Sequence, residues 1–210
     1  MIKKAYNKIF LGLLFVFFYF HINQFDLLPD FIGYFLVMKG LSDLSAWHPA
    51  FAKAKGAALV LACYAAFEQI CTLTQFSLSE IGLWFSWIVG LLPVACTLIL
   101  FLLLGKGTAE LLEKENQADA AKTATLVFGL KLGITLQHKL IALPLLSALF
   151  LLPPVSIGIT VLVVALNVLV IICIYQSGNA LQKAANIRAA QERMPPQESF
   201  PQNEPGGQES

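Results

Sequence analysis

Residues 155–175 read VSIGITVLVVALNVLVIICIY and contain no aspartate, glutamate, lysine or arginine. An α-helix needs about 20 consecutive apolar residues to cross the roughly 30 Å hydrocarbon core of a bilayer. The stretch is long enough, and its one strongly polar interruption is Asn167. It therefore predicts a membrane-spanning helix.

The composition of the whole chain agrees with that prediction. Hydrophobic residues make up 57% of the 210 residues and charged residues 13%, with a mean hydropathy of +0.71. Soluble domains usually have about 45–50% apolar and about 25% charged residues. The composition argues against a soluble enzyme domain, a disordered chain and a nucleic-acid binder, and makes the lipid bilayer the first expected partner.

Further apolar stretches predict an all-α, polytopic transmembrane bundle of six helices. The predicted spans are about 6–22, 27–44, 56–76, 81–104, 136–154 and 155–175. In the second span Gly33 and Gly40 are seven residues apart and share a helix face, where small residues allow a neighbouring helix to approach closely in lipid.

The fifth span is the least regular of the six. Its apolar part, 140–152, is too short to cross, and the extension to 136–154 includes Gln137, His138 and Lys139, whose side chains can extend to the interface. The preceding stretch, 125–136, is apolar apart from Lys131. That pattern is typical of a segment lying along the membrane surface.

Two segments are expected outside the bilayer. Residues 105–124 contain helix-favouring alanine, leucine, glutamate and lysine, which predicts a polar cytoplasmic helix. Residues 194–210 are rich in proline, glycine and glutamine, which predicts a disordered cytoplasmic tail after a membrane domain of residues 1–193.

The positive charges indicate the orientation. With six spans, all 14 lysines and arginines fall on one side of the membrane, including Lys131 and Lys139. The positive-inside rule makes that side cytoplasmic, and both termini with it. Five spans would put the C-terminal cations outside.

No motif of a known catalytic centre is present, and no cofactor or metal is expected. The chain lacks a phosphate-binding glycine loop, an H-E-x-x-H motif and a G-x-S-x-G motif. The four cysteines lie in apolar stretches without a C-x-x-C pair, as small apolar helix residues do; they are Cys63, Cys71, Cys96 and Cys173.

A polar stripe on the third span is the first candidate site. Its members are spaced to share one helix face and are Tyr64, Glu68, Cys71, Thr72 and Gln75. A charge within the bilayer is costly and should face protein or water, and Asn167 is a candidate partner for Glu68. The stripe fits a pathway for a solute or proton through Glu68, or hydrogen bonding between helices.

A second candidate is a cluster of ionisable residues on the outer face, comprising His21, Asp26, Asp30 and Glu80. Such groups can bind a cation or act as acid and base. Helix capping and ordinary solvation at the interface are the favoured explanation, since hard-cation sites usually need more oxygen ligands than two carboxylates provide.

Residues 25–44, FDLLPDFIGYFLVMKGLSDL, carry a resemblance. The segment resembles one near the start of small, uncharacterised multi-pass membrane proteins of Firmicute-type bacteria. The resemblance covers about 20 residues and implies a bacterial plasma membrane location, without an activity.

Three functions fit the sequence. The first is a non-enzymatic accessory or regulatory component of the plasma membrane, which associates with another membrane protein or with itself. The second is a small-solute or ion transporter or channel that uses the face around Glu68. The third is an intramembrane or lipid-modifying enzyme that uses the outer cluster.

Overall fold

Six helices make up most of the described chain. The computed structural model describes residues 2–17, 21–22, 25–26, 30–74, 83–140 and 153–192. The helices are α1 (Ile2–Phe17), α2 (Asp30–Leu44), α3 (Pro49–Leu73), α4 (Leu83–Lys114), α5 (Ala118–Leu140) and α7 (Pro153–Gln191). Strands β1 (His21–Ile22) and β2 (Phe25–Asp26) pair antiparallel.

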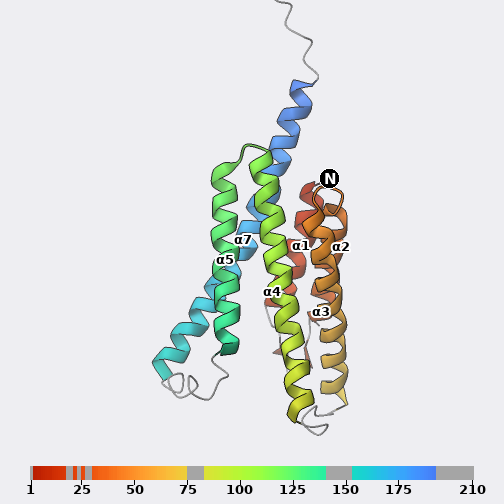
Figure 1. Cartoon of the computed structure of the whole chain (residues 1–210), viewed down its shortest axis with the longest axis vertical. Coiled ribbons are helices and arrows are strands. Elements are labelled where there is room, and N and C mark those ends of the chain that lie inside the picture. The colour runs from red at the N-terminus through yellow and green to blue at the C-terminus, as the bar shows by residue number, and fades with distance from the viewer. Residues whose placement is uncertain are drawn as a thin grey trace, which may run out of the picture.

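The helices form a closed ring in which each contacts its neighbours in sequence. Contacts run from α1 to α2, α3, α4, α5 and α7, and α7 returns to α1. Figure 1 shows the helices running alternately up and down, with the N-terminus and the C-terminal part of α7 at the same end of the bundle. The predicted all-α bundle is confirmed.

The predicted number of spans is only partly supported. Among the described residues three helical segments are long and apolar enough to cross a membrane: Pro49–Leu73, Gly90–Lys114 and Ile157–Gln191. The described helices α1 and α2 have 16 and 15 residues, fewer than the about 20 that a span needs. His21 and Ile22, expected within the first span, belong to β1 instead.

Glycines allow the backbones of α1 and α2 to lie close together. A Cβ atom on Gly33 would lie 2.7 Å from the carbonyl oxygen of Gly12, and one on Gly40 would lie 2.7 Å from that of Ala5. Because only hydrogen occupies those positions, the two helix backbones can approach each other at both glycines. The predicted close-packing face of Gly33 and Gly40 is confirmed.

The prediction of a separate polar helix over 105–124 is wrong. Helix α4 continues to Lys114, and α5 begins at Ala118. Asn116 between them has a φ of 57°, a left-handed conformation that asparagine tolerates and that commonly ends a helix. The Gln117 N–H donates to the Leu112 carbonyl at 2.8 Å, which closes the turn. The polar stretch is therefore the junction of two antiparallel helices.

The interpretation of residues 125–139 also changes. Residues 125–136 lie within α5, which packs between α4 and α7 instead of along a surface. Lys139 is 21 residues from the start of α5, about 32 Å along the helix. It therefore lies at the opposite end of the bundle from Lys114 and Lys122, which flank the α4–α5 junction. The central part of the predicted fifth span, 141–152, and the predicted tail, 194–210, lie outside the described residues.

Helices α3 and α7 are also longer than predicted. Helix α3 begins at Pro49 rather than at residue 56, because His48 Nδ1 accepts the Ala50 N–H at 3.2 Å and Pro49 suits the first helical position. Helix α7 continues from the predicted limit at Tyr175 to Gln191.

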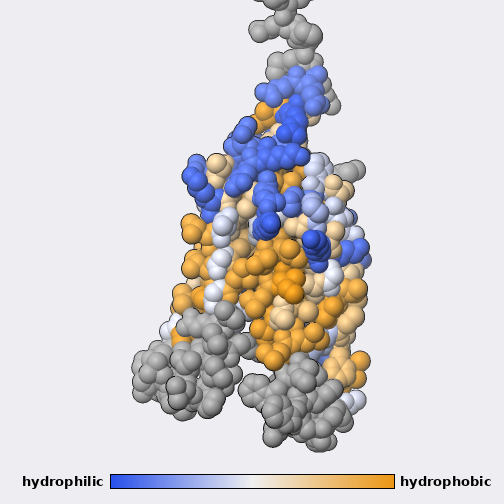
Figure 2. Space-filling model, viewed as in Figure 1, coloured by the Kyte–Doolittle hydropathy of each residue, from blue (hydrophilic) through white to orange (hydrophobic). Residues whose placement is uncertain are grey.

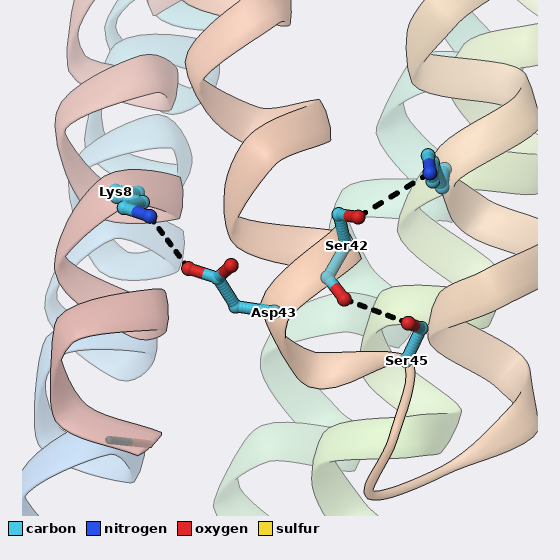
Figure 3. A network of polar contacts seen from close by, with 5 residues as sticks. Lys8, Ser42, Asp43 and Ser45 are labelled. Atoms are coloured by element: carbon cyan, nitrogen blue, oxygen red, sulfur yellow. Dashed lines mark hydrogen bonds and ion pairs between the residues drawn. The ribbon is translucent and has the colours of Figure 1, made fainter.

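Polarity divides the bundle along its length. In Figure 2 hydrophilic side chains cover the upper end, over the α4–α5 junction and the C-terminal part of α7, and hydrophobic side chains cover the region below. At the hydrophilic end Nζ of Lys8 on α1 lies 2.6 Å from Oδ2 of Asp43 on α2 (Figure 3). Nζ of Lys55 on α3 donates a hydrogen bond to the Ser42 hydroxyl at 3.3 Å. Arg188 of α7 pairs with Glu115 beside the α4–α5 turn.

Replacing Gly33 by alanine is expected to destabilise the bundle, because the added Cβ would lie against the Gly12 backbone and 2.7 Å from Val16 Cγ2. Overpacking of this kind costs about 1–3 kcal/mol. The control is Gly56→Ala on α3, where a Cβ would meet nothing within 4 Å. Thermal unfolding in detergent should lower the Tm of Gly33→Ala alone; equal melting of both variants would contradict the close α1–α2 contact.

Candidate functional site

Lys131 is the one buried lysine, arginine or acidic residue in the part of the chain whose side chains are described. It lies near the middle of α5 and is 8% exposed. The other buried polar side chains there are those of Thr108, which accepts a hydrogen bond from the Tyr6 hydroxyl at 3.1 Å, and Ser177. A buried ammonium is costly unless other groups compensate it, so the surroundings of Lys131 decide what it does.

Three other helices contact the Lys131 ammonium. Its Nζ donates to Oδ1 of Asn167 on α7 at 2.5 Å. It also lies 4.7 Å from the ring centre of Phe17 on α1 and 5.5 Å from that of Phe101 on α4. Cation–π contacts of this kind are worth about 0.5–2 kcal/mol each.

The described side chains give this ammonium no carboxylate partner. Their ion pairs are Lys8–Asp43, His48–Glu110, Lys106–Glu110 and Arg188–Glu115, all toward the basic end. An amide oxygen and two aromatic faces stabilise a positive charge less than a carboxylate does, because none of them carries a full negative charge.

A small cavity of about 160 Å³ adjoins Lys131. Its apolar walls come from α1, α4, α5 and α7 and are Leu13, Val16, Phe17, Phe101, Ile134 and Val163. Hydroxyl-bearing residues from three helices also line it: Tyr34, Thr97 and Thr135. The Thr135 hydroxyl donates to the Lys131 carbonyl at 2.8 Å, and its oxygen can still accept a hydrogen bond. The cavity therefore combines one cation with several hydroxyls in an apolar enclosure.

The predicted stripe on α3 does not reach this cavity. Glu68 and Thr72 are exposed, Tyr64 is half-buried and Cys71 is buried. The Thr72 hydroxyl donates to the Glu68 carbonyl at 2.9 Å, which is a local helix contact. Gln75 lies outside the described residues. Asn167, the candidate partner of Glu68, accepts a hydrogen bond from Lys131.

The outer cluster stays a hypothesis. His21 and Asp26 face each other as partners in the β1–β2 ladder, but their side chains are outside the description, as is all of Glu80. Asp30 is half-buried in the first turn of α2. No group of three metal-ligating side chains occurs in the described part of the chain.

The sequence contained an indication that Lys131 and Asn167 lie together, here called the Lys131 centre with the cavity beside them. Counting Lys131 with the basic residues on one side of the membrane led away from that interpretation. Lys131 interrupts the apolar stretch 125–136, and Asn167 interrupts the apolar stretch 155–175. The sequence analysis assigned Lys131 to the cytoplasmic side, where the positive-inside rule alone accounts for a lysine. Two isolated polar residues in neighbouring apolar helices instead indicate a hydrogen-bonded pair in the interior.

No protein family model, curated protein or solved structure matched the chain. The class that the fold and composition define is an all-helical bundle with three helices apolar enough to cross a membrane.

Replacing Asn167 by leucine is expected to destabilise the protein by about 1–3 kcal/mol, because it leaves the buried Lys131 ammonium without its hydrogen-bond acceptor. The double variant Lys131→Met with Asn167→Leu should recover much of that loss, since both polar partners are then absent. Denaturation of the wild type, both single variants and the double variant in detergent measures the coupling. Additive losses would contradict the pair.

Proposed function

We propose that this chain is a six-span integral membrane protein of a bacterial plasma membrane, with both termini on the cytoplasmic side. Three helices meet the length and hydropathy that a span requires. The alternating ring of six helices supports six crossings, with α5 rather than residues 136–154 as the fifth. The bacterial location rests on the similarity of residues 25–44 to multi-pass proteins of such organisms.

The lengths of two helices support this arrangement. Helices α4 and α7 have 32 and 39 residues, or about 48 and 58 Å, which exceeds a hydrocarbon core of about 30 Å. Their excess turns carry Lys106, Lys114, Lys183 and Arg188 at the basic end. That end is the one that the positive-inside rule assigns to the cytoplasm.

The function proposed for this protein is the binding and translocation of a small anion through the Lys131 centre. The observation that carries the proposal is a buried lysine with one amide hydrogen bond, no carboxylate partner among the described side chains, and a cavity beside it. Ionisable residues inside membrane bundles are costly and usually mark ion or substrate pathways. An anion in the cavity would supply the missing countercharge.

The size of the cavity limits the solute. A volume of about 160 Å³ is below the roughly 300 Å³ at which ordinary small-molecule pockets begin, and corresponds to about five waters at 30 Å³ each. Halide, nitrate and formate are of suitable size. The Thr97 hydroxyl can donate a hydrogen bond to such an anion.

An accessory role remains the second candidate, because α3 exposes both polar and apolar groups. Glu68 and Thr72 are exposed beside Phe67, Ile70 and Leu73, which are 45%, 59% and 66% exposed. A helix face with a carboxylate is unfavourable toward lipid and favourable toward another membrane protein. Co-purification of one partner that is lost in Glu68→Leu and retained in Lys131→Met would favour this role.

The topology can be tested with reporter fusions. Green fluorescent protein after Gln191 should fluoresce, and alkaline phosphatase inserted between Leu140 and Pro153 should be active, because the basic end stays in the cytoplasm. Each position is also tested with the other reporter. Phosphatase that is active after Gln191, or green fluorescent protein that fluoresces between Leu140 and Pro153, would contradict six spans with cytoplasmic termini.

Anion binding can be tested by thermal unfolding at constant ionic strength. Chloride, nitrate or formate should raise the Tm relative to gluconate, which is too large for the cavity. A ligand at 100 times its Kd stabilises the folded state by about 2.7 kcal/mol. Lys131→Met should lose the increase, and the control Glu68→Gln should keep it.

The same variants in liposomes test translocation. Liposomes that contain the wild type or Glu68→Gln should release trapped chloride faster than protein-free liposomes, and those that contain Lys131→Met should not. A Tm that does not depend on the anion, or flux that survives Lys131→Met, would contradict the proposed function.

A further inference from the structure

A second hollow, separate from the Lys131 cavity in its chemistry, lies between α4 and α5. It is a groove of about 410 Å³. Its floor is the contact between Gly105 of α4 and Phe128 of α5, where a Cβ on Gly105 would lie 2.7 Å from Phe128 Cβ. Gly129 widens it, since a Cβ at that position would meet nothing within 4 Å.

The groove changes character along its length. Away from the basic end its walls are apolar and include Phe101, Leu102, Phe128 and Leu132. Toward the basic end they include Lys106, Glu110, Glu113 and Thr125. Figure 2 shows the same gradient on the face that α4 and α5 present, hydrophilic near their junction and hydrophobic beyond it.

The length of the groove matches one leaflet. From Phe101 to Glu113 is 12 residues, or about 18 Å along α4. Half of a hydrocarbon core is about 15 Å. An occupant with one apolar chain and a charged head at the membrane surface would therefore fit both zones.

The charges at the polar end suit a head that carries both signs. Lys106 is well exposed, and its Nζ is 3.8 Å from Glu110 Oε1, while Glu110 Oε2 is 2.5 Å from His48 Nε2. The Lys106 ammonium is therefore only loosely paired with Glu110 and can contact a phosphate group. Glu113 is exposed, has no ion pair among the described side chains, and lies one turn beyond Glu110.

We propose that this groove binds one phospholipid with a primary-amine head, namely phosphatidylethanolamine. One of its two acyl chains lies over Gly105, Phe128 and Gly129, its phosphate contacts Lys106, and its ammonium contacts Glu110 and Glu113. Two carboxylates beside one lysine disfavour a purely anionic head such as that of phosphatidylglycerol. The site does not depend on anion binding at Lys131.

Native mass spectrometry of the full-length protein tests the proposal. The protein is delipidated in detergent and incubated with vesicles of equal parts phosphatidylethanolamine and phosphatidylglycerol. Wild type should retain one phosphatidylethanolamine. Gly129→Leu fills the groove and should lower retention about tenfold, equivalent to about 1.4 kcal/mol. The control Gly133→Leu, where a Cβ also meets nothing within 4 Å and which does not line the groove, should retain lipid as wild type does.

A charge variant tests head recognition without changing the groove's shape. Glu113→Gln should reduce the preference for phosphatidylethanolamine over phosphatidylglycerol, and the exposed control Asp119→Asn should not. Equal retention of both lipids by wild type, no retained lipid, or an unchanged preference in Glu113→Gln would overturn the proposal. So would retention by a Gly129→Leu variant that melts like wild type.

Discussion

A lysine ammonium in the middle of a helical bundle needs partners, and Lys131 obtains them from three other helices. Asn167 of α7 accepts its hydrogen bond, and Phe17 of α1 and Phe101 of α4 present their rings to it. Helix α5 packs mainly between α4 and α7 in the ring, and the contact of Lys131 with Phe17 also joins α5 to α1 across the bundle. The small cavity adjoins this side chain, and the chemistry proposed for the cavity depends on it.

The bundle around that centre is organised by a difference between its two ends. Polar contacts between helices gather at the basic end, where Lys8 pairs with Asp43, His48 with Glu110 and Arg188 with Glu115. Farther along, glycines and apolar side chains replace them, as where Gly12 of α1 meets Gly33 of α2. The two proposed sites use this division differently. The cavity lies among apolar walls, and the α4–α5 groove extends from apolar walls to charged ones.

Much of the fold could be predicted from the sequence, because apolar length and glycine spacing act locally. The all-α bundle and the Gly33–Gly40 face follow from such patterns. The break at Asn116 could not be predicted from helix propensity, since it depends on one left-handed residue within a helix-favouring stretch. That error shifted the predicted fifth helix and assigned Lys131 to the cytoplasmic side of the membrane. The contact between Lys131 and Asn167 could not be predicted for a related reason: the sequence shows which side chains are polar, but only packing decides which side chain faces which helix.

The central claim is that a small anion binds at the Lys131 ammonium, and bromide tests it most directly because the ion can be located by its anomalous scattering. Crystals of the protein grown in bromide should show an anomalous peak within hydrogen-bond distance of Lys131 Nζ, about 3.5 Å or less for so large an ion. The peak should occupy the cavity beside Thr97 and Thr135. A well-ordered Lys131 with no peak in that cavity, in crystals that bind bromide elsewhere, would contradict the account.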